Sequence, residues 1–555
     1  MARPAPRRTA PPPRPAAPLP VPTRTATASS PRQWSVDDGF SVSDRVLLAL
    51  TFALAGLYFA FSFASDGFYQ HDEVGHFVGM RGFWHDPNSA LGNWAKPGYK
   101  VLYAPFALFG PRAVALLNAL VAAGCAFAAT KTAERLGVRT PLFAFVLLAL
   151  QPLWLGLSFR DYAELPTALL LVLGVWAHVA DRPALAALAL SYAVTMRQEL
   201  APVALAYGVW LLVRRKPVPF ALLALFPLLQ NLWGWAATGD PLYLLHESLG
   251  TGANIADAYP RQGVWHYPST VLVIFGALAF TSLLVYLAQG LFGSGSEGKA
   301  KWHPVVLVPL GLYTAAHVAF QIQTPAIGPA TGGNLRYLTV VAPLLAILGA
   351  VGADRLTGER GERARLLWLL APFALATAVF LGYRDNGIAL TDVRWGVPLL
   401  TVLLASAVAL VPMRSRVRLG AMAGVAVLIA LLVVRPFRRT PEDAAVAETA
   451  AWARADGLDA RPVLVSHPLF HYFNGRAPGD YARGAGAATG AAIRAATPGT
   501  RIFWDSHYSH RPALRPDDLT YEALLADTAR YRLVRDPFVS SDQGFAVFVF
   551  DKVRP

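Results

Sequence analysis

Two adjacent acidic residues, Asp72 and Glu73, are at a position where acidic side chains are expected to take part in catalysis. They follow the first long apolar run almost at once, and His71 and His76 lie close to them in the chain. Charged side chains at membrane depth are costly and are usually kept for a task. Adjacent residues on a helix point about 100° apart, so only one of the two acids can face a given site. We therefore expect Asp72 to act as a general base, and Glu73 to hold a metal, a basic residue or a backbone amide.

The same stretch is compatible with two alternative roles. A capped amphipathic helix that lies on the membrane surface would place acids and aromatic residues in the same order. A divalent ion is the second alternative, because Asp72 and His76 are four residues apart and Glu73 is nearby. His71 and His76 are five residues apart, which does not put two imidazoles on one helix face. If a metal is used at all, magnesium or manganese is the cofactor to expect.

Three further groups of charged residues stand at the ends of apolar runs. Arginine forms paired hydrogen bonds with phosphate, and the two glycines before Asn334 allow a close approach of backbone to a ligand. Salt bridges that fix helix ends, or an arginine that snorkels to the interface, are the competing hypotheses. The groups are Arg160, Asp161 and Glu164; Arg197, Gln198 and Glu199; and Arg336 with Tyr337.

The composition indicates which elements position these residues. The chain has 555 residues, of which 54% are hydrophobic and only 15% charged, whereas soluble domains carry about 25% charged residues. This composition predicts a multi-span α-helical membrane protein. The net charge of +14 fits Arg-rich loops that face an anionic cytoplasmic leaflet rather than a nucleic acid. Cys125 is the only cysteine, which excludes an intrachain disulfide and a thiolate metal cluster.

About thirteen apolar runs approach the roughly 20 residues that a membrane-spanning helix needs. Basic loops alternate with longer, less basic loops, so the positive-inside rule predicts a cytoplasmic N-terminus and an odd number of spans. All four groups of charged residues then lie on the outer face. The runs are 46–64, 113–130, 141–159, 165–180, 184–196, 200–213, 218–237, 270–292, 305–321, 338–353, 366–383, 397–411 and 419–434.

Three segments follow from this pattern. Residues 1–43 are rich in Pro, Ala and Arg and predict a disordered basic cytoplasmic tail. Residues 44–436 form the transmembrane part, with a first outer loop at 66–101. Residues 437–555 predict a small extracytoplasmic α/β domain, because Thr440-Pro441-Glu442-Asp443 begins a helix and four strand-like runs follow. These runs are 462–466, 500–504, 531–535 and 545–550, with helical stretches at 444–454 and 519–530.

Histidines gather in the predicted outer domain. His467, His471, His507 and His510, together with Ser506, suggest a hydrolase. No nucleophile elbow or Gly-rich oxyanion turn surrounds Ser506, so we set this hypothesis aside.

The pattern as a whole resembles the C-type membrane glycosyltransferases, the GT-C superfamily, which includes protein O-mannosyltransferases and aminoarabinose transferases. The residues that carry the resemblance are His71-Asp72-Glu73 in the first outer loop and the later charged groups. An odd-numbered helix bundle followed by an outer domain is also similar to that superfamily. In it, the first-loop acid activates the acceptor and late basic residues hold the phosphate of a lipid-linked sugar.

The resemblance implies a role for each residue. Asp72 is the base and Glu73 supports it, while Arg336, Tyr337 and Arg160 bind the donor phosphate. The supporting residues of the site are His71, His76, Asp161, Glu164, Arg197 and Glu199.

We therefore expect a glycosyltransferase of the bacterial plasma membrane. It would move mannose or a similar hexose from a polyprenyl-phosphate donor to a hydroxyl of a glycan, lipid or protein, and it would bind no nucleic acid. A secondary transporter is one alternative, but it predicts inverted repeats and charges at mid-membrane depth. A non-catalytic partner in the assembly of cell-envelope polysaccharide is the other, and it predicts that Asp72 is dispensable.

Overall fold

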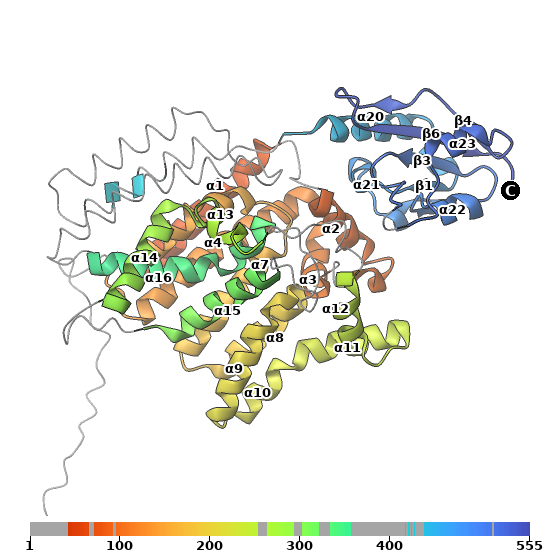
Figure 1. Cartoon of the computed structure of the whole chain (residues 1–555). Helices are drawn as coiled ribbons and strands as arrows, with labels where there is room; N and C mark the ends of the chain where they lie inside the picture. Colours follow the sequence, from red (N-terminus) through yellow and green to blue (C-terminus); the bar gives the residue numbers. More distant parts are fainter. Residues whose placement is uncertain are drawn as a thin grey trace, which may run out of the picture. The chain divides into compact units, whose positions relative to one another are not determined.

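The described part of the chain is a set of α-helices followed by a small mixed sheet (Figure 1). Phe40–Pro555 forms one unit, to which both the helices and the sheet belong. The computed structural model describes residues 43–65, 71–92, 96–253, 263–292, 302–320, 334–356, 438–512 and 515–555, together with 417, 420, 421, 423, 424 and 427.

The helical part begins with a long apolar helix, α1, and ends in the described residues with α16 (Figure 1). Short helices α2 and α3 occupy the predicted first outer loop. The elements are α1 (Asp44–Phe63), α2 (His71–Gly82), η1 (Pro87–Ala90), α3 (Pro97–Ala107), α4 (Pro111–Arg135), α5 (Leu142–Ala149), α6 (Pro152–Leu157), α7 (Glu164–Val179), α8 (Pro183–Met196), η2 (Gln198–Leu200), α9 (Ala201–Val213), α10 (Pro217–Leu223), α11 (Leu225–Thr238), α12 (Tyr243–Ala253), α13 (His266–Phe275), α14 (Ala277–Phe292), α15 (Pro304–Phe320), η3 (Leu335–Val341) and α16 (Ala342–Leu356).

Four helical segments within the described residues are long and apolar enough to cross a membrane: Asp44–Phe63, Pro111–Arg135, Pro217–Thr238 and Leu335–Asp354. Shorter apolar helices accompany them, and the chain is an integral membrane protein. The expected count of about thirteen spans is not confirmed. The predicted spans 366–383, 397–411 and 419–434 lie outside the described residues, apart from isolated positions in the last one.

Two predicted spans are interrupted in the structure. The run 141–159 divides into α5 and α6 at Pro152, because proline has no N–H to donate and its ring clashes with the preceding turn. The run 270–292 divides into α13 and α14 at Gly276, whose φ of 76° is left-handed. A Cβ at Gly276 would lie 2.9 Å from the Pro152 ring, so glycine also permits the close contact between the two breaks.

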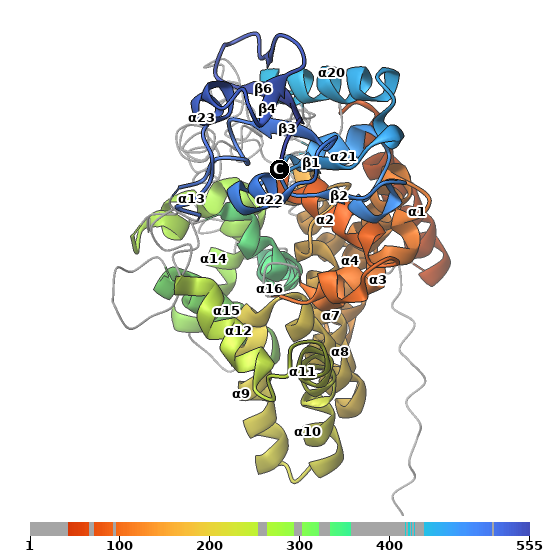
Figure 2. The same cartoon turned by 90° about the vertical axis from the view of Figure 1, so that its right-hand side faces the viewer.

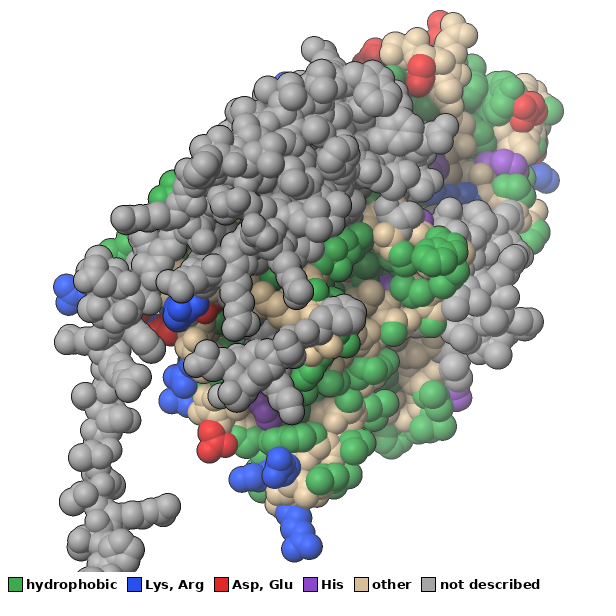
Figure 3. Space-filling model, turned by 60° about the vertical axis from the view of Figure 1, so that its left-hand side comes forward, with side chains coloured by type: hydrophobic (Ala, Val, Ile, Leu, Met, Phe, Trp, Pro, Cys, Tyr) green, Lys and Arg blue, Asp and Glu red, His purple; other side chains and the backbone are tan. Residues whose placement is uncertain are grey.

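Several helices expose large apolar side chains. On α9 to α11, Leu205, Val213 and Val218 have 70%, 75% and 67% of their surface exposed. One face of the molecule carries hydrophobic side chains across its described middle, with charged side chains towards its ends (Figure 3). Such apolar surface is costly in water and is expected where helices face lipid.

The C-terminal part is built on a six-stranded sheet with the order β2-β1-β3-β6-β4, in which β5 also pairs with β6. The pairs β1–β2 and β1–β3 are parallel, and the pairs that involve β6 are antiparallel. The four predicted strands correspond to β1, β3, β4 and β6. The elements are α20 (Pro441–Ala455), η4 (Leu458–Ala460), β1 (Val463–Val465), α21 (Pro468–Phe473), η5 (Pro478–Asp480), β2 (Ala485–Gly486), α22 (Gly490–Ala495), β3 (Arg501–Asp505), α23 (Tyr521–Ala526), β4 (Tyr531–Leu533), β5 (Phe538–Val539) and β6 (Ala546–Lys552).

Helices cover both faces of this sheet (Figure 2). Alternate side chains of a strand point to opposite faces, so Phe503 of β3 packs with α20 and α21, whereas its neighbours Ile502 and Trp504 pack with α22 and α23. The first of these cores also contains Val74 and Phe77 of α2. A continuous apolar core therefore connects the first-loop helix with the C-terminal part.

The predicted start of α20 is confirmed in detail. The Thr440 side chain accepts a hydrogen bond from the Asp443 amide, and the Asp443 carboxylate accepts one from the Thr440 amide. This reciprocal pair satisfies two amides that the first turn of a helix leaves without partners.

Candidate functional site

An ion pair joins α2 to the start of η3. Nη2 of Arg336 donates a hydrogen bond to Oδ2 of Asp72 at 2.9 Å, and Nε of Arg336 donates to Oε1 of Glu164 at 3.1 Å. The Arg336 and Glu164 side chains are 5% and 1% exposed, whereas that of Asp72 is 42% exposed. Asp72 is thus the member of this group that substrates can reach.

Glu164 connects Arg336 to a second buried arginine. Nη1 of Arg197 donates to the same Glu164 oxygen at 2.7 Å, and Nη2 of Arg197 donates to Glu199 at 3.1 Å. Burial by itself raises the pKa of Glu199, but the charge of Arg197 dominates and lowers it to about 2. The Glu199 carboxylate is therefore ionised. Ion pairs join Asp72, Glu164, Arg197, Glu199 and Arg336 into one continuous network.

Tyrosine rings stack against both guanidinium groups. Arg336 lies 4.2 Å from the centre of the Tyr162 ring, and Arg197 lies 4.4 Å from that of Tyr337. Cation–π contacts of this kind hold an arginine in place without using its N–H donors. Tyr337 therefore supports the arginines directly, and its sequence-based assignment to the donor phosphate stays a prediction.

Glu73 points away from Asp72, as adjacent helical positions require. It is fully buried, and its Oε1 accepts a hydrogen bond from the backbone N–H of Asp161 at 3.0 Å. The Asp161 carboxylate accepts a further bond from the Tyr99 hydroxyl. Of the alternatives for Glu73, the backbone amide is the partner found, so Glu73 fixes the segment before α7 against α2.

Two other expected site residues are buried nearby. The His76 ring packs edge-on against Tyr99 at 5.7 Å, and burial together with Lys96 and Lys100 lowers its pKa. Nε of Arg160 donates to the Gly156 carbonyl at 3.4 Å, and its guanidinium lies 4.8 Å from the Phe159 ring. These contacts of Arg160 are local, and its role in phosphate binding stays a prediction.

Lys96 is a site residue that the sequence analysis missed. It precedes α3 with a left-handed φ of 54°, a backbone conformation that non-glycine residues rarely adopt and that often marks functional sites. Burial, reinforced by the charge of Arg197, lowers the pKa of Lys96 to about 8. The WAKPG sequence around Lys96, between two aromatic-rich stretches, was the signal that could have revealed it.

His71, the first residue of α2, turns away from the Asp72–Arg336 pair. Its Nε2 donates to Asp443 of α20 at 3.0 Å, and its Nδ1 lies 2.9 Å from the Tyr508 hydroxyl. Asp72 and His76 do not belong to any group of three or more possible metal ligands among the residues that the structure describes. His71 does belong to such a group, with partners from the C-terminal part.

Comparison with known proteins gives the fold but no sequence family. No protein-family model and no curated protein matches the chain. The crystal structure of ArnT from Cupriavidus metallidurans in the apo state is similar with a TM-score of 0.60 and 14% identity, over 91% of this chain and 98% of that chain. The crystal structure of ArnT from the same organism bound to undecaprenyl phosphate is similar with a TM-score of 0.56 and 13% identity, at the same coverage. The chain therefore has a GT-C fold, as the sequence predicted.

Proposed function

We propose that the chain is a membrane glycosyltransferase that moves a sugar from a polyprenyl-phosphate-linked donor to an acceptor hydroxyl on the extracytoplasmic face. The observation that carries the proposal is the hydrogen-bonded pair of Asp72 and Arg336, which places a solvent-accessible carboxylate beside a buried cation. The ArnT fold, seen in one crystal structure with undecaprenyl phosphate, supports the choice of donor.

Asp72 acts as the general base in this proposal. Its Oδ2 is held by Arg336, while no hydrogen bond to its Oδ1 is found among the described residues. Oδ1 can therefore accept the proton of an acceptor hydroxyl, at the hydrogen-bond distance that base catalysis requires. As the proton moves to Asp72, the acceptor oxygen attacks the anomeric carbon, and the bond from that carbon to the phosphate oxygen breaks.

The leaving polyprenyl phosphate needs positive charge more than it needs a proton, since it departs as an anion. Arg336 supplies that charge together with Lys96, whose Nζ makes no ion pair with any described residue. The two remaining carboxylates, Glu164 and Glu199, are both engaged by Arg197. As Oδ1 of Asp72 takes the proton, the carboxylate loses its charge, and the N–H group that Arg336 donates to Oδ2 can be donated to phosphate instead.

The proposed sugar is mannose or a similar hexose, and direct attack on the anomeric carbon predicts inversion. The test is transfer of radiolabelled mannose and other hexoses from polyprenyl-phosphate donors by the purified full chain in lipid nanodiscs. The proposal predicts a glycosylated product with inverted anomeric configuration and stoichiometric release of polyprenyl phosphate. A product with retained configuration, or a chain that transfers from a nucleotide sugar and not from lipid-linked donors, would overturn it.

A further inference from the structure

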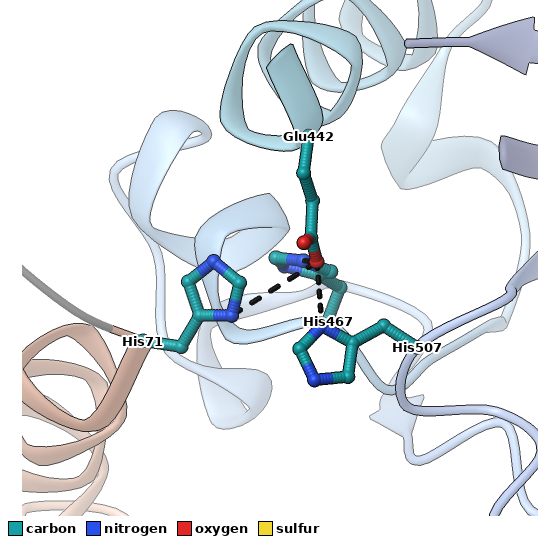
Figure 4. A group of neighbouring side chains, drawn as sticks. All are labelled: His71, Glu442, His467 and His507. Carbon is teal, nitrogen blue, oxygen red and sulfur yellow. Dashed lines mark hydrogen bonds and ion pairs between the residues drawn. The ribbon is translucent and has the colours of Figure 1, made fainter. Parts of the chain in front are cut away.

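Three imidazoles and one carboxylate converge where α2 meets the C-terminal part (Figure 4). His71 begins α2, Glu442 lies in the first turn of α20, His467 directly precedes α21, and His507 follows β3. One possible ligand atom from each lies within 4.8 Å of all the others. Their point of convergence is the Glu442 carboxylate, towards which all three rings turn (Figure 4).

The individual distances are those of a compact site. Oε1 of Glu442 lies 2.7 Å from Nδ1 of His507, 3.0 Å from Nε2 of His467 and 4.0 Å from Nδ1 of His71. A tetrahedral zinc ion with bonds of about 2.0–2.1 Å separates its ligand atoms by roughly 3.3 Å. Small rotations of the four side chains would therefore produce the coordination shell.

A carboxylate already holds the nitrogen of His71 that faces away from the cluster. Its outward nitrogen, Nε2, donates to Oδ1 of Asp443 at 3.0 Å, and the other oxygen of Asp443 is fixed by the Thr440 amide at 3.0 Å. Ligating histidines usually donate their second N–H to a carboxylate in this way, which orients the ring and increases the basicity of the ligating nitrogen.

Binding of an ion has identifiable costs. Nδ1 of His71 would give up its 2.9 Å contact with the Tyr508 hydroxyl in order to bind the ion. When Nε2 of His467 binds the ion, the proton of that ring moves to Nδ1, which then loses a weak 3.3 Å hydrogen bond from the Leu469 amide. The ion would also replace the protons that His467 and His507 share with Glu442. The alternative is a proton-bridged cluster without metal, and the metal content of the chain separates the two.

We propose that His71, Glu442, His467 and His507 bind one divalent cation of the zinc class. Imidazole nitrogens suit zinc, whereas magnesium and manganese prefer all-oxygen ligands. This site is therefore separate from the magnesium or manganese ion considered for Asp72 and His76, which stays a prediction. The ion would tie the C-terminal part to the helix whose second residue is Asp72. In this way the ion would position Asp72. Only this consequence rests on the proposed function, in which Asp72 is the base.

The direct test is the metal content of the full chain, purified in detergent with a histidine-free affinity tag. After incubation with zinc chloride and removal of free ion, elemental analysis is expected to give about one zinc per chain for the wild type. The His507→Ala variant removes a side chain that is 41% exposed, so folding is retained, and its zinc content is expected to fall at least tenfold. A wild type without zinc, or a His507→Ala variant with wild-type zinc content, would overturn the proposal.

The matched control is His85→Ala. His85 is also a half-exposed histidine, and its Nε2 contacts Asp480 of the C-terminal part at 2.7 Å, but it does not belong to the cluster. Its loss is expected to leave the zinc content unchanged. A fall equal to that of His507→Ala would show that zinc content follows the contact between the two parts rather than coordination.

The contact between Asp443 and His71 allows an independent measurement. Asp443→Asn cannot serve both His71 and Thr440 as the carboxylate does, and loss of such a partner typically weakens metal affinity about 10–100-fold. Competition with a chromophoric chelator measures this change, and the visible spectrum of the cobalt-substituted chain reports whether coordination is tetrahedral. An unchanged affinity together with an octahedral cobalt spectrum would contradict the proposed site. Neither measurement requires sugar transfer, so failure of the proposed function would leave both results interpretable.

Discussion

Asp72 and Arg336 are 264 positions apart in the chain, yet Oδ2 of the first and Nη2 of the second lie 2.9 Å apart. The acid comes from the first turn of α2 and the arginine from the start of η3. Glu164 holds the same guanidinium from the other side. The proposed base and the cation are thus placed by two elements that a buried network ties together, rather than by a single loop.

Arg336→Lys is expected to weaken donor use. A lysine ammonium is a compact point charge and cannot reproduce the directed contacts of a guanidinium with Asp72, Glu164 and phosphate. The KM for the lipid-linked donor should rise at least about tenfold, equivalent to about 1.4 kcal/mol. Steady-state transfer kinetics at varied donor concentration measure it.

Arg139→Lys is the control for that substitution. Arg139 also contacts a carboxylate, that of Asp354, but its side chain is 47% exposed and it has no contact with the site network among the described residues. Its KM should stay at the wild-type value. If both substitutions raised the KM for the donor equally, Arg336 would not be part of the donor site.

Glu164→Gln is expected to destabilise the fold as well as the site. The carboxylate is 1% exposed and neutralises two buried arginines, and removal of one partner from a buried ion network costs on the order of 3 kcal/mol. Denaturation of the detergent-solubilised protein, followed by tryptophan fluorescence, measures the loss.

Glu134→Gln provides the comparison for stability. Glu134 pairs with Lys131 on the surface and is 54% exposed, so its loss should cost less than about 1 kcal/mol. If Glu164→Gln proved no more destabilising than Glu134→Gln, the buried network would not hold η3 and α7 together.

The pH dependence of kcat/KM for the donor is expected to show the ionisation of Lys96. Burial lowers its pKa to about 8, so the ammonium is present at pH 7 and is lost as the pH rises through 8. Because kcat/KM reports ionisations of the free enzyme, kcat/KM for the donor is expected to fall above pH 8.

Lys96→Arg should remove that fall, since a guanidinium remains charged at every pH used. Lys96→Met should lower kcat/KM at pH 7 and leave it flat through pH 8. A wild-type profile that persists in Lys96→Met would assign the ionisation to a different group.

The sequence predicted those parts of the structure that depend on local pattern. The strands around Val463, Arg501, Tyr531 and Ala546 were recognisable from β-branched and aromatic runs, and the start of α20 from the residues after Thr440. The divergence of Asp72 and Glu73 followed from helix geometry alone. These features need no information about distant residues.

Contacts between distant segments were not predictable in the same way. The sequence showed separate acid–arginine groups, but not that Glu164 bridges Arg197 and Arg336. The aromatic-rich setting of Lys96 was a signal in the sequence, but the charged neighbours of Lys96, Arg197 and Arg336, are known only from the structure. Pro152 and Gly276 also interrupt runs whose hydrophobicity is continuous, so hydropathy alone suggested unbroken spans.

The most direct measurement is sugar transfer by Asp72→Asn compared with the wild type. Asparagine keeps the shape and an oxygen for Arg336 but cannot accept a proton, so the rate of transfer should fall about 10²–10⁴-fold while the affinity for polyprenyl phosphate changes little. Equal amounts of folded protein and an unchanged KM for the donor establish that only the chemical step is affected. Transfer by Asp72→Asn at the wild-type rate would contradict the assignment of Asp72 as the base.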